Sequence, residues 1–479
     1  MKFRTDLLVS AAILTCLASA AHAGAFTAGN LVISVYGDVN GTSYVDNQAS
    51  PIELEQITTG GAFVSSMLLP QSNAMVNGVQ NYAISGEYGS SSEGLLQRSS
   101  NGAYLTIAGY GISAAQFDAN AQSFGGGTKT CIGVGTCYPL AQTASVPTAG
   151  ATVVSRVIGL IDANGNVNTS TALTGVFNEN NPRSVATADG KSFYISGQGF
   201  DKNDTTTQGV FLAQLGATTA TPIDTSFDTR SVEIVNGKLY VSSDSTEGSG
   251  VHENISTYGG LPTSAATASI LPNLQSKYKT TSASQLNSLD GALGGQKIYL
   301  SPESYFFANA TTLYIADSGN PKGDNNGTGK TTQGLGDGGL QKWVLSGGVW
   351  TLEYTLSAGL LDFVPDTTAC GPNQVDCGTT GLIGLTGEVV GDDVDLFATN
   401  STLGDEDQTY LYGITDALDS TTGAGEAFAM LDKAAPGTNI RGVAFAPVPE
   451  PATWMVFLLG LLGLGALVRF GSGPGRRTV

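Results

Sequence analysis

Histidine is nearly absent from this chain of 479 residues, which has only His22 and His252. His22 lies in an N-terminal segment that we expect to be removed, so one histidine remains. A histidine-ligated metal centre needs several imidazoles and is therefore excluded. A Ser-His-Asp triad would have to use His252, which lies in a polar stretch between Gly250 and Asn254, and we expect a solvated loop residue there.

Positive charge is also scarce. Charged residues make up 13% of the chain, and 21 Lys and Arg stand against 40 Asp and Glu, which gives a net charge of −19. Nucleic acid and anionic membrane faces attract basic surfaces, so this balance argues against both as partners of the main body. The acidity keeps an exported protein soluble and identifies no ligand.

Cysteine is limited to five residues, and Cys16 lies in the N-terminal segment expected to be lost. The other four form two close pairs, Cys131 with Cys137 and Cys370 with Cys377. In an exported chain such pairs predict two local disulfides. Zinc is the alternative, although the spacing within each pair is wider than zinc sites use.

Long apolar runs occur only at the two ends of the chain. At the N-terminus, Lys2 and Arg4 precede an apolar segment over residues 7–17 and the small-residue site Ala21-His22-Ala23. This order is typical of a secretory signal peptide. We expect residues 1–23 to be removed and the mature chain to begin near Gly24.

The second apolar run follows the residues Val448-Pro449-Glu450-Pro451. It is uncharged from Ala452 to Val468, carries Trp454 near its start, and is followed by arginines, of which Arg469 is the first. The length predicts a short membrane-spanning helix over residues 452–470 with a basic tail over residues 469–477. Arginines stay on the cytoplasmic side, so everything before Pro449 is expected outside.

The order of Val448-Pro449-Glu450-Pro451, apolar helix and basic tail resembles the PEP-CTERM sorting signal of Gram-negative bacteria that produce exopolysaccharide. The resemblance covers residues 448–479 only. It implies recognition by a membrane protease of the exosortase type, a transient stay in the inner membrane, and processing near the motif. The protein would then reach the cell surface or the extracellular polymer. An ordinary C-terminal anchor, and hence a membrane-tethered receptor, is the alternative.

Between the two ends, one pattern recurs: a strand, a tight polar turn and a second strand, often with tyrosine. In one copy, residues 230–235 and 239–243 flank Asn236-Gly237. Asn-Gly and Asp-Gly are turns that need positive φ and strongly favour hairpins. The other copies cover residues 93–109, 183–197, 305–317 and 382–398.

Each copy is followed by residues suited to two more strands, which indicates four-stranded units. The strand over residues 440–445 lacks outer strands, and the strand over residues 31–36 lacks an inner pair. Joining the two ends in one unit would close a ring and leave no open edge at the junction. We therefore predict an all-β ectodomain over residues 24–447, a β-propeller of about six four-stranded blades. A β-sandwich or β-helix is the alternative.

Candidate sites for small ions and for catalysis are weak. Asp162, Asn164 and Asn166 place oxygen atoms at alternate positions, as calcium loops do, but an Asn-Gly turn between strands explains them equally. Similar clusters occur at Asp38-x-Asn40, Asp201-x-Asn203-Asp204 and Asp324-Asn325-Asn326, and adjacent carboxylates at Asp392-Asp393 and Asp405-Glu406-Asp407. We expect no cofactor beyond this possible calcium, and no catalytic residue.

These observations predict an exported, non-catalytic surface or matrix protein, associated with exopolysaccharide or biofilm. The alternative is a propeller hydrolase or lyase acting on polysaccharide through carboxylates at the central channel. Carboxylates clustered at one end of the channel would favour the enzyme, and a channel lined by Ser, Thr and Ala would count against it.

Overall fold

A computed structural model describes most of the chain between residues 25 and 449. The described ranges are 25–38, 44–131, 135–147, 150–201, 204–244, 253–276, 300–319, 338–363, 378–402, 404 and 407–449. The predicted signal peptide and the predicted membrane helix lie outside these ranges. Within them, no helix has the length and apolar character needed to cross a membrane.

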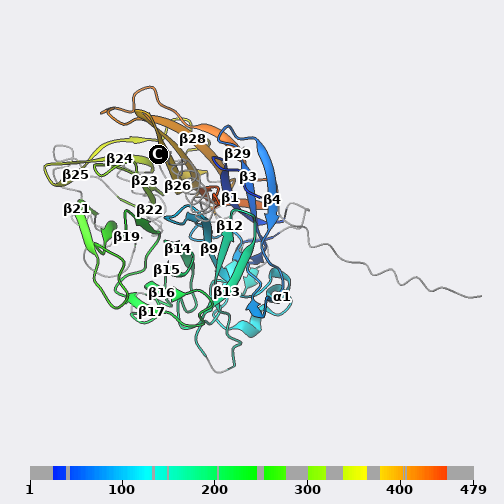
Figure 1. The fold of residues 1–479 in the computed structure, drawn as a ribbon. Coiled ribbons are helices and arrows are strands. Elements are labelled where there is room, and N and C mark those ends of the chain that lie inside the picture. Colours follow the sequence, from blue (N-terminus) through cyan, green and yellow to red (C-terminus); the bar gives the residue numbers. More distant parts are fainter. Residues whose placement is uncertain are drawn as a thin grey trace, which may run out of the picture.

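Six four-stranded antiparallel sheets follow one another round a ring, so the predicted β-propeller is confirmed (Figure 1). We call the strands of each blade A to D from the axis outward, and number the blades in chain order. Blade 1 is β30 (Thr438–Phe445), β1 (Leu31–Gly37), β3 (Ile52–Ile57) and β4 (Phe63–Leu68). Blade 2 is β8 (Gln97–Arg98), β9 (Tyr104–Tyr110), β12 (Arg156–Asp162) and β13 (Val167–Leu173). Blade 3 is β14 (Pro182–Thr187), β15 (Ser192–Gly197), β16 (Gly209–Gln214) and β17 (Thr221–Asp224).

The remaining blades follow the same plan. Blade 4 is β18 (Val232–Val235), β19 (Lys238–Asp244), β20 (Glu253–Thr257) and β21 (Ser269–Ser276). Blade 5 is β22 (Pro302–Phe307), β23 (Thr312–Asp317), β24 (Gly339–Ser346) and β25 (Val349–Leu356). Blade 6 is β26 (Thr379–Val390), β27 (Asp393–Thr402), β28 (Tyr410–Ala417) and β29 (Ala429–Lys433).

The ring closes through the two ends of the chain, as predicted. β30 pairs with β1 in the register Leu31↔Phe445 and Val32↔Ala444, so the last strand becomes the A strand of blade 1. Figure 1 shows the orange-red strand of the C-terminal end beside the blue strands of the N-terminal end. Both strands are buried along their length: β1 is paired on both edges, with β30 and β3, and β30 is the innermost strand of its blade, beside the axis.

Among the described residues the hydrophobic core forms seven clusters, of which six lie between neighbouring blades, one for each pair, and the seventh packs α1 and η1 against the end of blade 2. Between blades 4 and 5, for example, Ile255 packs with Leu313 and Trp343. Between blades 6 and 1, Phe397 and Leu411 pack with Ile33. Apolar residues therefore occur on both faces of each sheet, because every sheet is covered on both sides.

Hydroxyl groups link the A strands of successive blades; we call them latches. Thr399 on β27 accepts a hydrogen bond from the Gly384 amide (3.0 Å) and donates one to the Arg441 carbonyl of blade 1 (2.6 Å). Ser242 on β19 similarly accepts from the Ser231 amide and donates to the Glu303 carbonyl of blade 5. Ser34, Thr106 and Ser196 donate to Gly94, Val185 and Arg230 of the following blades. In blade 5, Ala316 stands at the corresponding position.

The strand directions give the ring two different faces. The A–B and C–D connections meet at one face, which we call the turn face, and the B–C and D–A connections meet at the other, the loop face. A–B turns are tight: Asn236 and Gly237 have φ of 49° and 73° between β18 and β19, as a primed hairpin turn requires. The predicted Asn-Gly turns thus lie on the turn face.

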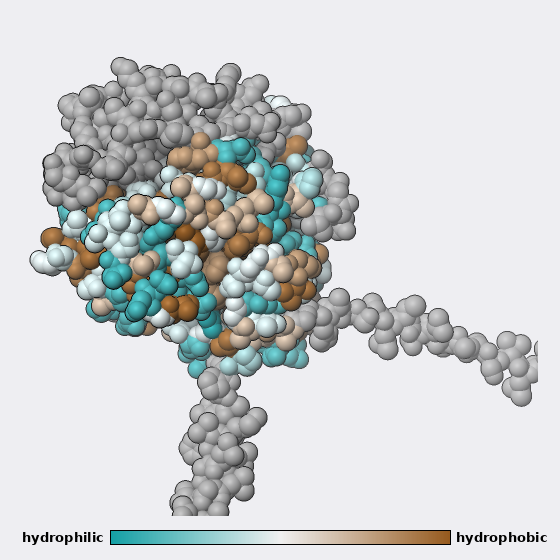
Figure 2. Space-filling view, turned by 90° about the horizontal axis from the view of Figure 1, so that it is seen from above, coloured by the Kyte–Doolittle hydropathy of each residue, from teal (hydrophilic) through white to brown (hydrophobic). Residues whose placement is uncertain are grey.

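Several short elements were not predicted from the sequence. The hairpin of β5 (Ala74–Val76) and β6 (Val79–Asn81) lies against β13, and a pair joins β2 (Ala49–Ser50) to β7 (Gly86–Glu87). The B–C connection of blade 2 holds α1 (Ala114–Asp118), η1 (Ala121–Phe124) and the hairpin of β10 (Lys129–Cys131) with β11 (Gly135–Cys137). Figure 2 shows polar and apolar residues intermixed on the visible side of the molecule.

Candidate functional site

The chain leaves the ring at the centre of the turn face. After β30, the Ala446 amide donates to the Asn30 carbonyl and the Val448 amide to the Gly102 carbonyl, both at 2.8 Å. Gly102 belongs to the A–B turn of blade 2. Pro447 is buried, Val448 is half-buried and Pro449 is exposed. The predicted sorting motif therefore begins where the chain first meets solvent.

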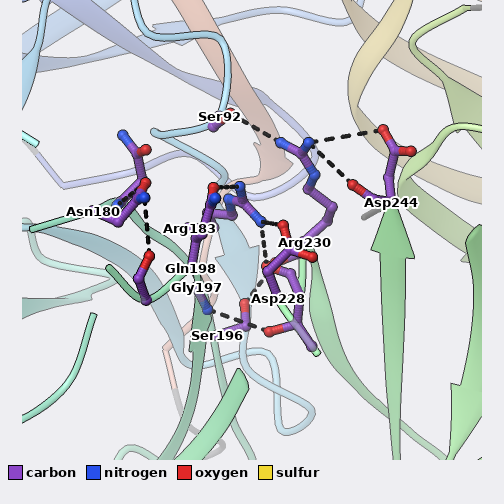
Figure 3. A network of polar contacts seen from close by, with 12 residues as sticks. Ser92, Asn180, Arg183, Ser196, Gly197, Gln198, Asp228, Arg230 and Asp244 are labelled. Carbon is purple, nitrogen blue, oxygen red and sulfur yellow. Dashed lines mark hydrogen bonds and ion pairs between the residues drawn. The ribbon is translucent and has the colours of Figure 1, made fainter. Parts of the chain in front are cut away.

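At the loop-face end of the axis, charged side chains form a buried network (Figure 3). Arg183 on β14 lies 3.2 Å from Asp228 and donates to the Gln198 side chain at 2.7 Å and to the Thr229 carbonyl at 3.0 Å. Burial, together with the nearby Arg230, lowers the pKa of Arg183 to about 10. The guanidinium remains charged at neutral pH, so Arg183 and Asp228 form a buried ion pair.

Arg230 extends the network to three further segments. Its guanidinium donates to Ser92 at 2.9 Å and lies 3.8 Å from the carboxylate of Asp244 and 3.6 Å from that of Glu303. Burial raises the pKa of Asp244 to about 7; Arg230 opposes this shift and Glu303 adds to it. Arg183, Arg230 and Glu303 come from blades 3, 4 and 5, so the network joins successive blades around the axis.

A second buried network lies beside the first, where the connections of blades 1 and 2 meet. Glu93 accepts hydrogen bonds from the Tyr110 hydroxyl (2.5 Å) and the Asn181 amide (2.6 Å), and burial raises its pKa. Arg156 is fully buried, lies over the Tyr110 ring at 4.7 Å and donates to several backbone carbonyls, including that of Phe177. These contacts fix the long connections to the ring.

Carboxylates are thus clustered at one end of the axis, the arrangement that an enzyme acting on polysaccharide would need. Each carboxylate of the first network, however, faces an arginine: Asp228 faces Arg183, while Asp244 and Glu303 face Arg230. The hydroxyl latches lie on the B strands, between neighbouring blades. The chemistry available here is anion and cation pairing, and burial raises the pKa of Asp244 to about 7.

The predicted calcium candidates have structural roles in the parts of the chain that the structure describes. Asp162 accepts from the amides of Asn164 and Asn166, both at 2.9 Å, so its carboxylate closes the turn between β12 and β13. Asp204 accepts from Phe200, Thr206 and Thr207; burial opposes the effect, but these hydrogen bonds lower the pKa of Asp204 to about 2. Among the described residues, no group of three or more His, Cys, Asp and Glu side chains could hold a metal ion.

Other candidates are only partly covered by the described ranges. Asp392 and Asp393 form the exposed A–B turn of blade 6, and Asp407 accepts from the amides of Gly378 and Gly404. The hairpin register places Cys131 opposite Gly135 and Cys137 opposite Lys129, and the disulfides remain predictions. Outside the described residues lie His252, Cys370, Cys377, Asn40, Asn203, Asp324, Asn325, Asn326, Asp405, Glu406, Glu450 and Pro451.

The arginines of the axis were not predicted as site residues, although the sequence contains a signal for them. A charged residue followed by serine recurs at the start of three A strands, in Arg183-Ser184, Arg230-Ser231 and Glu303-Ser304. Since A strands line the axis, this repetition places three charges around one end of the channel.

The sequence matches no family model, and no curated protein matches it. Solved structures with a similar fold include a glucose dehydrogenase, with a TM-score of 0.34 and 9% identity over 81% of this chain and 97% of that chain. Apo AztD from Citrobacter koseri gives a TM-score of 0.29 and 7% identity over 88% of this chain and 100% of that chain. Such distant likeness concerns the fold and says nothing about activity.

Proposed function

We propose that this protein is an exported, non-catalytic propeller that a membrane protease of the exosortase type releases to the cell surface or the extracellular polymer. The observation that carries the proposal is the position of the chain exit. The ring is complete at Phe445, Val448 is the last of the described residues to donate a backbone hydrogen bond to the ring, and Pro449 is exposed. Cleavage at or after the motif would leave every blade intact.

The paired state of the axial carboxylates supports a non-catalytic role. A glycosidase needs one carboxylic acid to donate a proton and a second carboxylate as base or nucleophile. Asp228, Asp244 and Glu303 are held by arginines that also join the blades. We propose that this network maintains the ring, and that exopolysaccharide is bound and not cleaved.

The mass of the mature protein tests the sorting proposal. From cells that carry an exosortase-type protease, the intact mass should correspond to a chain that begins near Gly24 and ends near Pro449. Replacing Pro449, Glu450 and Pro451 with alanine should leave residues 452–479 attached. A mature protein that still contains those residues without the replacements would contradict the proposal and leave an anchored ectodomain.

The hydrolase or lyase remains a second candidate because Asp244 combines a pKa near neutrality with a position beside Glu303. Incubation with a panel of bacterial polysaccharides should give binding without new reducing ends or unsaturated products. Product formation that disappears in Asp244→Asn but persists in the exposed control Asp419→Asn would establish the enzyme instead.

A further inference from the structure

We propose that the turn face of the propeller lies against the lipid bilayer while the precursor is anchored, and that the loop face with its axial network points away. The inference rests on the proposed function, because it needs the C-terminal run to be a membrane helix. It goes beyond that function in assigning a membrane-contacting surface to the folded ectodomain.

The first argument is the length of chain between the ring and the predicted helix. Val448 is hydrogen-bonded to Gly102 at the centre of the turn face, and the uncharged run begins at Ala452. Four Cα–Cα steps span at most about 14 Å when fully extended. The polar headgroup region on one side of a bilayer is itself about 5–8 Å thick. The ring therefore cannot stand clear of the membrane.

The second argument is the point of attachment. The tail leaves from the axis and not from the rim, because Gly102 lies in an A–B turn beside the A–B turn of blade 3, where the Asn101 amide donates to the Ala188 carbonyl. A short tether at the centre of a disc brings the whole face close to the surface. A tether at the rim would instead allow the disc to stand on its edge.

The turn face carries exposed apolar side chains, one from each of five blades and one from the β5–β6 hairpin beside blade 2. In blades 1, 3, 4 and 5 this side chain lies in or next to the C–D turn; in blade 6 it ends β26; beside blade 2 it comes from the β5–β6 hairpin. These residues are Phe63 (63% exposed), Leu215 (42%), Leu261 (39%), Val349 (46%), Val390 (52%) and Val79 (49%).

The hairpin belongs to this face because of a groove of about 610 Å³. Val76 and Val79 line the groove together with the turn at Asp162 and Asn166 and the turn at Asp189–Lys191. Those are the C–D turn of blade 2 and the A–B turn of blade 3, which both lie on the turn face. The apolar tip of the hairpin therefore continues the ring of exposed side chains.

Charge does not account for the contact. The turn face carries Lys191 and Lys238 but also Asp189 and Asp392, and the whole chain is acidic. Exposed apolar side chains alone do not identify the membrane-facing side either, because Phe200 and Phe227 are exposed on the loop face. The position of the tail selects it, and apolar tips are the side chains suited to the boundary between headgroups and acyl chains.

The orientation is tested with the precursor, residues 24–479, in vesicles of phosphatidylethanolamine and phosphatidylglycerol. Single cysteines labelled with an environment-sensitive fluorophore replace turn-face residues in Val349→Cys and Val390→Cys. Phe200→Cys and Phe227→Cys are matched controls on the loop face, and the unsubstituted chain gives the background from native cysteines. Nitroxide on the lipid headgroups should quench the turn-face probes several-fold more than the loop-face probes.

Insertion of the tail is measured in the same vesicles through Trp454, whose fluorescence bromine atoms on the acyl chains should quench; Trp454→Phe is the control. Quenching of Trp454 with equal or reversed quenching of the two probe sets would overturn the orientation and leave the proposed function standing. Absence of Trp454 quenching would overturn the membrane tail, and the orientation with it.

Discussion

Glu233 on β18 is a carboxyl group whose environment is set by burial. Burial raises the pKa of Glu233 from 4.5 to about 8. A charged carboxylate is costly at this half-buried position, because less water solvates it than in the unfolded chain, and the cost appears as a preference for the protonated form. Glu233 therefore destabilises the folded state little at mildly acidic pH, and more as the pH rises and the carboxyl group becomes charged.

The pH dependence follows from the sign of this shift. Between pH 4.5 and 8 the folded state binds a proton at Glu233 that the unfolded state has released, so stability falls as pH rises. The stabilisation that comes from proton binding at Glu233 is fully present below pH 4.5 and disappears as the pH rises past 8. Its size is on the order of a few kcal/mol. Glu233→Gln should be more stable than the wild type at pH 8.5, by urea unfolding, and should change less between pH 5 and 8.5.

The exposed Asp419 provides the control. Asp419→Asn should show the same difference in the free energy of unfolding between pH 5 and pH 8.5 as the wild type. If the stability of Glu233→Gln depended on pH as that of the wild type does, the charged carboxylate of Glu233 would already be stabilised in the folded protein, by water or by a nearby cationic side chain.

The burial and the charged neighbours of individual side chains could not be predicted from the sequence. Arg230 and Glu233 both appeared in the repeated strand pattern, but nothing in that pattern states that one faces Asp244 and Glu303 while the other is half-buried with a raised pKa. The environment of an inner-strand residue depends on the neighbouring blade, which is distant in sequence. Arg183 and Asp228, for instance, meet only because blades 3 and 4 are adjacent.

At the scale of the strands, local chemistry was sufficient. Asn236-Gly237 and Asp189-Gly190 predict hairpin turns, and both form A–B turns of the structure. Strand alternation gave the A–B pairs, and the residues that follow each copy were assigned to two further strands. The β5–β6 hairpin and β10–β11 were missed because they are insertions that follow no repeat.

Because the hydroxyl latches join neighbouring blades, removing one hydroxyl group should lower the free energy of unfolding. Thr399→Val keeps the shape of the side chain but leaves the buried Gly384 amide and Arg441 carbonyl without the hydroxyl that they share. We expect a loss of about 1–3 kcal/mol in the free energy of unfolding, measured by urea denaturation. Thr399→Ser retains the hydroxyl and should lose much less.

An exposed serine separates the latch from the general effect of removing a hydroxyl. Ser226→Ala lies outside the latches and should change stability by less than about 0.5 kcal/mol. If Thr399→Val were as stable as the wild type, the hydrogen bonds between blades 6 and 1 would not contribute to holding the ring.

At the scale of the whole molecule, the closing strand connects the propeller to the proposed sorting signal. The sequence predicted it from a simple mismatch: strands at the N-terminal end without inner partners, and an inner strand at the C-terminal end without outer ones. The structure confirms the pairing of β1 with β30. How far beyond β30 the chain stays hydrogen-bonded to the ring could not be predicted. It depends on Asn30 and Gly102, which are remote in sequence from their partners Ala446 and Val448.

This arrangement makes ring closure depend on residues that immediately precede the proposed cleavage region. A chain of residues 24–433 lacks β30 and would expose the edge of β1, including the fully buried Leu31 and Ile33. It would also lose the β30 part of the cluster between blades 6 and 1. Exposed edge strands with apolar side chains pair with other chains, so we expect aggregation on size-exclusion chromatography. A chain of residues 24–449 should be monodisperse, with the thermal midpoint of the processed protein. A monodisperse 24–433 chain with that same midpoint would show that the other five blades close without the terminal strand, and protease processing would then be free to act further upstream.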